Sequence, residues 1–262
     1  MNLIQRRKLI LDELKINESV EVKILAKMTK SSEVTIRNDL RELEQQGKLV
    51  RFFGGAHRKA QLITETFNHE LSKDELAVSN RYAINSDAKL RIAKYAATLV
   101  PLNATLILDS GSTTHLIAEE LAKRGNITVI TNNLLAAVSL SNAINTTLIL
   151  CGGLYRAKSH SLHGKIAEEA LRDIRADLMF IGADSFDPVL GMTTFNEGFN
   201  ISRVMSEKAN QIIAVVDSSK FKRAGYNQIL STEQIDILIT DTGITSELTN
   251  EFTNKGINVK SV

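Results

Sequence analysis

The stretch SSEVTIRNDLREL, residues 31–43, decides the fold of the first part of the chain. Its two leading serines can accept hydrogen bonds from the free N–H groups of a first helical turn, as helix caps do. The apolar side chains after them recur at helical spacing, and Gly47 is placed to end the pattern. We therefore expect a helix over about residues 32–46. The side chains expected to form its buried stripe are Val34, Ile36, Leu40 and Leu43.

Two helices before this stretch and a hairpin after it complete a small unit. Apolar residues at helical spacing predict one helix over residues 3–16 and a short one over residues 22–28. The segment KLVRFFGGAHR, residues 48–58, alternates loosely and turns at its two glycines, which predicts a short β-hairpin. Three helices followed by such a hairpin are typical of a winged helix-turn-helix unit. We place this unit at residues 1–58 and a linker at residues 59–80.

The helix over residues 32–46 carries side chains suited to DNA. In the major groove Arg pairs with guanine and Asn with adenine, while hydroxyls and the cations of a wing reach the backbone or the minor groove. The residues expected to contact DNA are Ser32, Glu33, Thr35, Arg37, Asn38, Arg41, Arg51, His57 and Arg58. Asp39 would repel phosphates, so we expect it to pair internally with Arg37 or Arg41. The alternative is an ordinary solvated helical face.

Charge is distributed unevenly along the chain. The net charge of the 262 residues is +2, but residues 1–60 hold 13 Lys and Arg against 8 Asp and Glu, and the remainder is mildly acidic. A basic N-terminal segment before a mildly acidic remainder is typical of a phosphate-binding module joined to a larger domain.

The start of the chain and its cysteine content bear on the compartment. Charged residues interrupt the opening apolar run, which does not resemble a secretion signal. No apolar window approaches the ~20 residues that cross a bilayer. Cys151 is the single cysteine, so it has no partner for an internal disulfide. We expect a reduced, cytoplasmic protein.

The rest of the chain alternates short apolar strands with helices. The expected strands are 105–109, 127–131, 147–150, 178–182, 212–217, 237–240 and 257–260. The expected helices are 80–95, 114–123, 134–142, 164–173, 199–210 and 246–255. Continuous apolar strands separated by helices predict a parallel sheet covered on both faces, so the fold class is α/β, with this domain at residues 81–262. Ligands of such sheets bind at the carboxyl ends of the strands.

Polar residues and glycines gather at these strand ends. The turn DSGSTT, residues 109–114, leads into a helix, and its hydroxyls and N–H groups can surround a phosphate. Lys220 can neutralise that phosphate, and carboxylates and amides can take sugar hydroxyls. The residues expected to bind this ligand are Asp109, Ser110, Gly111, Ser112, Thr113, Thr114, Thr131, Asn132, Gly152, Gly153, Asp184, Glu197 and Lys220. The alternatives are a plain strand-to-helix turn at 109–114 and a helix cap at Glu197.

Other reactive side chains are given ordinary roles. Cys151 is expected to be a small buried hydrophobe. The loop with Lys158, His160 and His163 either lines the pocket or is solvated. The histidines show no metal-ligand spacing, so we expect no metal, and we assign no cofactor and no catalytic residue.

Several of these motifs resemble the DeoR family of transcriptional regulators, over about residues 4–260. They include SEVTIRNDL at 32–40, RFFGGA at 51–56, LDSGSTT at 108–114, TVITNN at 128–133, GAD at 182–184 and DSSKF at 217–221. The resemblance implies a Rossmann-like second domain, similar to ribose-5-phosphate isomerase and glucosamine-6-phosphate deaminase, that senses a phosphorylated sugar. The stretch GMTTFNE, residues 191–197, resembles regulators of hexitol and amino-sugar use, which implies a hexitol or hexose phosphate.

The sequence therefore predicts a repressor that leaves its DNA operator when a sugar phosphate binds, acting as a homodimer or homotetramer because one head reads too few base pairs. One alternative is a sugar-phosphate isomerase or deaminase with Asp184, Glu197 and Lys220 as acid and base groups. Another is a DNA-binding protein that answers to a protein partner. The winged unit disfavours the enzyme, because an isomerase has no use for it.

Overall fold

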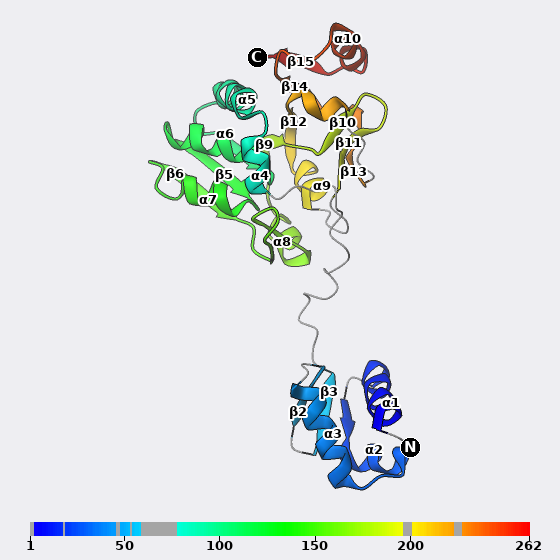
Figure 1. Ribbon diagram of the computed structural model, residues 1–262. Helices are drawn as coiled ribbons and strands as arrows, with labels where there is room; N and C mark the ends of the chain where they lie inside the picture. Colours follow the sequence, from blue (N-terminus) through cyan, green and yellow to red (C-terminus); the bar gives the residue numbers. More distant parts are fainter. Residues whose placement is uncertain are drawn as a thin grey trace. The chain divides into compact units, whose positions relative to one another are not determined.

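The chain is described by a computed structural model over residues 3–17, 19–45, 48–52, 54–58, 78–195, 201–222 and 227–262. It divides into two compact units, Met1–Leu71 and Ser72–Val262, which we call the head and the sensor unit (Figure 1). Most of the expected linker lies outside the described residues. Its last three residues belong to helix α4 (Val78–Ala83).

The head has the expected helices and hairpin. Helices α1 (Leu3–Ile16), α2 (Val22–Thr29) and α3 (Glu33–Gln45) precede strands β2 (Leu49–Phe52) and β3 (Gly55–Arg58). A further strand, β1 (Ser19–Glu21), pairs antiparallel with β3 and makes the hairpin a three-stranded sheet. This strand has three residues, too few to show an alternating pattern.

The buried side of α3 differs from the expected stripe at one position. Ile36, Leu40 and Leu43 are buried in the core of the head, but Val34 is 64% exposed. Val34 lies about 200° around the helix from Ile36, because successive residues turn by about 100°. The inclusion of Val34 in the stripe was therefore wrong.

The expected partners of Asp39 were also wrong. Its side chain is 3% exposed. Its carboxylate accepts hydrogen bonds from the Nε–H of Arg6 at 2.5 Å and the Nε–H of Arg7 at 2.9 Å, and both arginines lie on α1. Asp39 lies beside Leu40 on the side of α3 that faces the core. The ion pairs therefore join α1 to α3 and leave the outer face of α3 unaffected.

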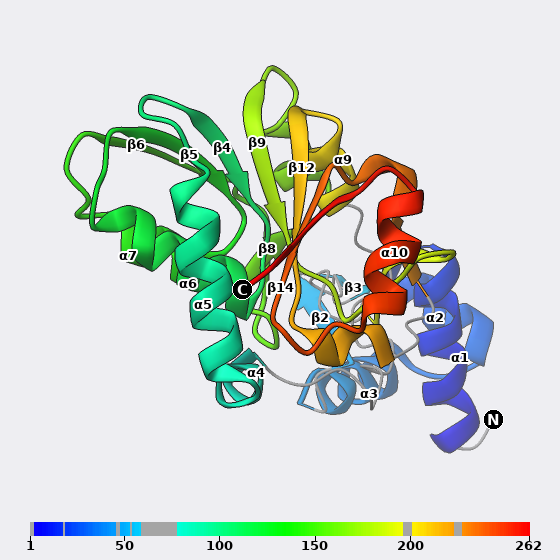
Figure 2. The same ribbon diagram turned by 90° about the horizontal axis from the view of Figure 1, so that it is seen from above.

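The sensor unit is built on a seven-stranded parallel sheet (Figure 2). The strand order is β15-β14-β12-β9-β4-β5-β6. The strands are β4 (Thr105–Leu108), β5 (Ile127–Thr131), β6 (Thr146–Leu150), β9 (Ala176–Ile181), β12 (Ala209–Val215), β14 (Ile237–Thr240) and β15 (Asn258–Ser261). All seven expected strands are present, so the prediction of a parallel α/β sheet is confirmed.

Helices cover both faces of this sheet. One hydrophobic core packs α5 (Ser86–Thr98), α6 (Ser112–Ala122) and α7 (Leu134–Leu140) on one face. The second core packs α8 (Lys165–Glu169), α9 (Ile201–Ser206) and α10 (Ser246–Asn254) on the other. Strand residues alternate between the two cores, which explains why the strands are apolar along their whole length.

Several short elements were not expected. Strands β7 (Leu154–Arg156) and β8 (Ser161–His163) form a hairpin, and β10 (Ser185–Asp187), β11 (Gly191–Thr194) and β13 (Asn227–Leu230) form a small sheet. The helix expected over residues 80–95 is two helices, α4 and α5, because Asn85 between them is left-handed with φ 53°. No helix among the described residues is long and apolar enough to span a membrane.

Candidate nucleic-acid interface and ligand pocket

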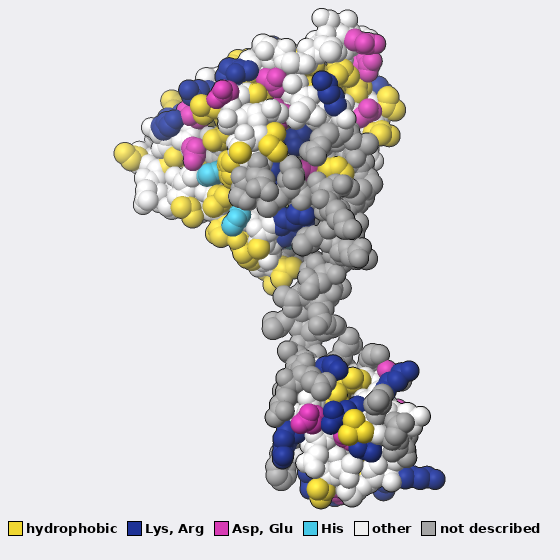
Figure 3. All heavy atoms as spheres, in the orientation of Figure 1, with side chains coloured by type: hydrophobic (Ala, Val, Ile, Leu, Met, Phe, Trp, Pro, Cys, Tyr) yellow, Lys and Arg dark blue, Asp and Glu magenta, His cyan; other side chains and the backbone are white. Residues whose placement is uncertain are grey.

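The outer face of α3 carries several of the residues expected to contact DNA. Arg37, Asn38 and Arg41 are exposed, and they recur at the three- and four-residue spacing of one helix face. Exposed Lys and Arg side chains are visible over the surface of the head (Figure 3). In the described part of the head, these three side chains lie outside the hydrophobic core.

The first turn of α3 is held by its own polar side chains. The Ser32 hydroxyl accepts a hydrogen bond from the Thr35 N–H at 3.1 Å, which caps the helix. Glu33 pairs with Arg37 at 2.8 Å across one turn. This exposed pair is worth little in stability, but it orients the Arg37 guanidinium along the helix. Arg51 is half-exposed, and the side chains of His57 and Arg58 lie outside the described residues.

A pocket lies in the sensor unit where the strand order reverses. After β4 the chain moves outward through β5 and β6, and it then returns to place β9 on the opposite side of β4. Such a switch point leaves a crevice at the carboxyl ends of the two central strands. The segments that follow β4 and β9 line the pocket at residues 109–114 and 182–184. The end of β12 and the segment after it contribute Val215, Val216, Asp217 and Lys220.

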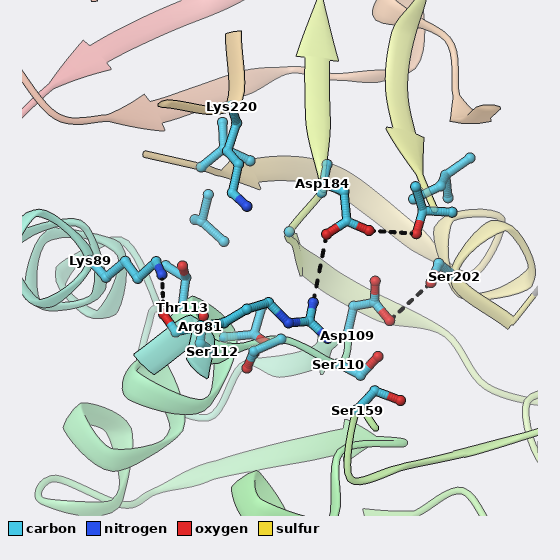
Figure 4. A pocket seen from close by; sticks show the side chains of 18 of the residues that line it. Arg81, Lys89, Asp109, Ser110, Ser112, Thr113, Ser159, Asp184, Ser202 and Lys220 are labelled. Atoms are coloured by element: carbon cyan, nitrogen blue, oxygen red, sulfur yellow. Dashed lines mark hydrogen bonds and ion pairs between the residues drawn. The ribbon is translucent and has the colours of Figure 1, made fainter. Parts of the chain in front are cut away.

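The start of α6 provides hydroxyl and N–H groups to the pocket. Ser110, Ser112 and Thr113 line it together with Gly111 (Figure 4). The hydroxyl of Thr114 donates to the carbonyl of Gly111 at 3.1 Å, so it stabilises the turn itself. The first N–H groups of a helix have no partner within the helix and carry the positive end of its dipole, which favours an anion.

Lys89 and Arg81, two cations from the start of the sensor unit that sequence reasoning missed, also line the pocket. The Lys89 ammonium donates to the carbonyls of Arg81 at 2.5 Å and Ile84 at 2.7 Å. Burial lowers the pKa of Lys89 to about 8, and the Asp217 carboxylate opposes this effect. The Arg81 guanidinium reaches across to Asp184 at 3.8 Å (Figure 4). A lysine on the buried stripe of α5 was the available signal, since a buried lysine needs a polar partner.

Three carboxylates face the same pocket. Asp109 accepts a hydrogen bond from the Ser202 hydroxyl at 3.0 Å, and burial raises its pKa to about 6. Asp184 accepts from the Thr194 hydroxyl at 2.9 Å. Asp217 accepts from the Asn85 amide at 2.7 Å, and its second oxygen is buried without a partner among the described residues. Carboxylates held in this way can accept hydrogen bonds from ligand hydroxyls.

The β7–β8 hairpin adds a second group of polar residues. Arg156, Ser159 and His163 line the pocket, and a chain of hydrogen bonds runs from Arg156 through Ser159 and Ser161 to the Nε2 of His163. Burial lowers the pKa of His163 to about 4, which keeps it neutral at physiological pH. His160 bonds to the Tyr155 hydroxyl at 2.7 Å instead.

The expected ligand-binding residues divide into two groups. The pocket is lined by Asp109, Ser110, Gly111, Ser112, Thr113, Thr114, Asp184 and Lys220. The residues that the structure places outside this lining are Thr131, Asn132, Gly152 and Gly153. Glu197 lies outside the described residues.

The second group has other contacts. The Thr131 hydroxyl donates to the Leu108 carbonyl at 2.7 Å, and the Asn132 amide donates to the Leu162 carbonyl at 3.1 Å. Gly153 has a φ of 128°, and a Cβ there would collide with the carbonyl oxygen of His163. These residues lie at or just after the ends of β5 and β6, which are on the far side of β4 from the crevice.

The chain matches two family models that cover both units. Residues 6–61 match the DeoR-like helix-turn-helix domain, and residues 84–242 match the DeoR C-terminal sensor domain. A protein of Escherichia coli O157:H7 named as an aga operon transcriptional repressor is 36% identical over 97% of this chain and 92% of its own length. The HTH-type transcriptional regulator GolR of Listeria innocua is 34% identical over 98% of this chain and 97% of its own.

Solved structures with similar folds were also found. Ribose 5-phosphate isomerase A of Methanocaldococcus jannaschii has a TM-score of 0.40 and 23% identity, covering 52% of this chain and 55% of that one. A probable sor operon regulator of Shigella flexneri has a TM-score of 0.42 and 12% identity, covering 70% of this chain and 93% of that one. On the two family models and the full-length relatives, this chain belongs to the DeoR family of transcriptional regulators.

Proposed function

We propose that the protein represses an operon for carbohydrate use and leaves its operator when a phosphorylated sugar binds the sensor unit. Relatives support the regulated class: one is named for the aga operon, and another, 27% identical over 242 residues, is the glycerol-3-phosphate regulon repressor of Escherichia coli K12. The outer face of α3 would read the operator, and the pocket would bind the effector.

The chemical class of the effector is inferred from the side chains that line the pocket. The start of α6, Lys89 and Arg81 form a cationic, N–H-rich side that suits a phosphate dianion. Asp109, Asp184 and Asp217 would repel a bare anion, but they accept hydrogen bonds from hydroxyl groups. A ligand with both a phosphate and several hydroxyls satisfies both sides. We therefore propose a sugar or sugar-alcohol phosphate, with hexitol and hexose phosphates as the first compounds to test.

We further propose that the pocket senses its ligand without transforming it. Relatives that cover this chain along its length are named as regulators. An acid or base group must be able to exchange a proton with the substrate. Asp184 is held by the Thr194 hydroxyl, by the Phe195 N–H at 3.2 Å and by Arg81, and these contacts fix the position of its carboxylate.

Thermal unfolding against a panel of sugar phosphates and the matching free sugars tests the effector. A ligand that binds only the folded state stabilises it by about 2.7 kcal/mol at a hundredfold excess over its dissociation constant. We expect one or two phosphorylated sugars to raise the midpoint and their free forms to leave it unchanged. Lys220→Ala should abolish the shift. Lys222→Ala is the matched control, because Lys222 is exposed and outside this pocket.

Operator binding tests the head. Arg37→Ala should weaken specific binding by about five- to 150-fold, the value of one Arg–guanine contact, without changing the ligand-induced shift. The control is Arg175→Ala, which removes the same charge from an exposed position of the sensor unit. Equal operator affinities of the Arg37 variant and the wild type would show that α3 is not the reading helix.

A further inference from the structure

One long segment of the sensor unit carries no charge. Between Arg124 and Arg156 there is no Asp, Glu, Lys, Arg or His, although 24% of the chain is charged. The segment contains β5, α7, β6 and the start of β7. β5 is buried in the sheet, but α7 and β6 lie at one end of it (Figure 2). A surface in this position normally carries charged side chains, so their absence needs an explanation.

Strand β6 is an edge strand without the usual protection. Within the described residues it pairs with β5 alone, and every one of its residues is exposed or half-exposed. Exposed edges pair readily with other strands, and proteins commonly block them with lysine, proline or a bulge. The opposite edge, β15, carries Lys260. The sequence TTLIL of β6 has no such residue.

Exposed hydrophobic side chains lie beside this edge. Val138 on α7 is 64% exposed, Ile144 in the turn before β6 is 76% exposed, and Leu150 at the end of β6 is 39% exposed. Hydrophobic side chains are visible at this end of the sensor unit (Figure 3). Single exposed hydrophobic residues are common, but here three accompany an unprotected strand edge. We call α7, the turn after it and β6 the neutral face.

We propose that the neutral face binds the neutral face of a second copy of this chain, with the two β6 edges pairing antiparallel about a two-fold axis. At such an interface each residue near the axis meets its own counterpart, so charges would face like charges. An uncharged face avoids this repulsion. DNA and anionic membranes are disfavoured as partners because both are held mainly by cations.

The symmetry also suits the proposed function, on which this part of the inference rests. A two-fold dimer presents two heads, and paired half-sites on an operator have the same symmetry. The pairing is expected without DNA and without ligand. Its failure can therefore be distinguished from a failure of operator or effector binding.

Sedimentation velocity of the full-length protein at micromolar concentration, without DNA, tests the interface. Thr147 is exposed on β6, so Thr147→Lys and Thr147→Glu should fold normally, which circular dichroism checks. We expect the wild type to be an oligomer, and each variant to associate at least about tenfold more weakly because like charges meet across the axis. An equimolar mixture of the two variants should regain the wild-type mass, because Lys then faces Glu.

A matched control separates this face from other exposed hydrophobic positions. Val189 is 79% exposed in the turn between β10 and β11, outside the neutral face. Val189→Glu should keep the wild-type mass, whereas Val138→Glu should lose it. The proposal is overturned by a monomeric wild type, or by oligomers that the Thr147 and Val138 variants leave intact.

Discussion

Two residues of α3, Val34 and Ile36, show how position on a helix decides the role of similar side chains. Ile36 is fully buried against the other helices of the head, and Val34 is 64% exposed on the face that carries Arg37 and Asn38. Ile36→Ala should therefore destabilise the head by about 2–4 kcal/mol through lost burial and a cavity. Val34→Ala should change stability by less than about 0.5 kcal/mol. Urea unfolding measures both, and similar losses for the two variants would contradict the assignment of the faces.

Asp109 makes the stability of the sensor unit depend on pH. Burial raises its pKa from 3.8 to about 6, so the folded state binds more protons than the unfolded state between these values. Its contribution to stability therefore falls as pH rises from about 4 to 6, by up to about 3 kcal/mol. Asp109→Asn has no proton to lose here.

Comparing the wild type with Asp109→Asn isolates the contribution of Asp109 titration to stability. The free energy of unfolding of Asp109→Asn minus that of the wild type should become more positive over this pH range and then level off above pH 6. A difference that stays constant from pH 4 to pH 7 would show that Asp109 titrates normally.

At the scale of elements, the strands of the main sheet were predictable and those of the smaller sheets were not. The strands of the main sheet are continuous apolar runs because both faces are covered, and such runs are visible in the sequence. β7, β8, β10, β11 and β13 have three or four residues each, and their pairing depends on tertiary neighbours. This limit affects the site, because the β7–β8 hairpin brings Arg156 and Ser159 to the pocket.

The order of the strands explains the remaining difference between the expected and observed pocket. The sequence indicates that Thr131 and Asp109 both lie at the ends of strands, but it does not show that β9 lies beside β4 on the side away from β5. The strand order therefore brings Asp184 into the crevice and leaves Thr131 outside it. Lys89 enters from α5, which precedes the sheet, so strand ends alone could not reveal it.

We expect the Thr131 hydroxyl to stabilise the contact between neighbouring strands and not to bind the ligand. Its buried hydroxyl donates to the Leu108 carbonyl and accepts from the Asn133 N–H at 3.0 Å, connecting β4, β5 and the start of α7. Thr131→Val keeps the shape but removes both bonds, which should cost about 1–3 kcal/mol of stability. Thr128→Val, at a half-buried position of the same strand, is the control and should cost less. Chemical unfolding compares the two, and loss of effector binding at full stability would instead give Thr131 a direct role.

For the whole molecule, the proposed function requires that ligand binding in the pocket change the affinity of the head for DNA. Arg81 belongs to α4, the first described element of the sensor unit, and its carbonyl is one of the two that accept hydrogen bonds from Lys89. A phosphate that draws Arg81 away from Asp184 would change the surroundings of α4. Such a ligand shifts DNA affinity only if it binds one arrangement of the protein more tightly than another. Release of the operator by a sugar phosphate therefore requires coupling between the pocket and the operator-binding head.

The most direct test measures operator affinity by fluorescence anisotropy while the stabilising sugar phosphate is added. We expect the operator dissociation constant to rise by about five- to 150-fold as the pocket fills, and to stay constant with the free sugar. Lys220→Ala should bind the operator as the wild type does and show no response. A sugar phosphate that binds the wild-type pocket and leaves operator affinity unchanged would contradict the account.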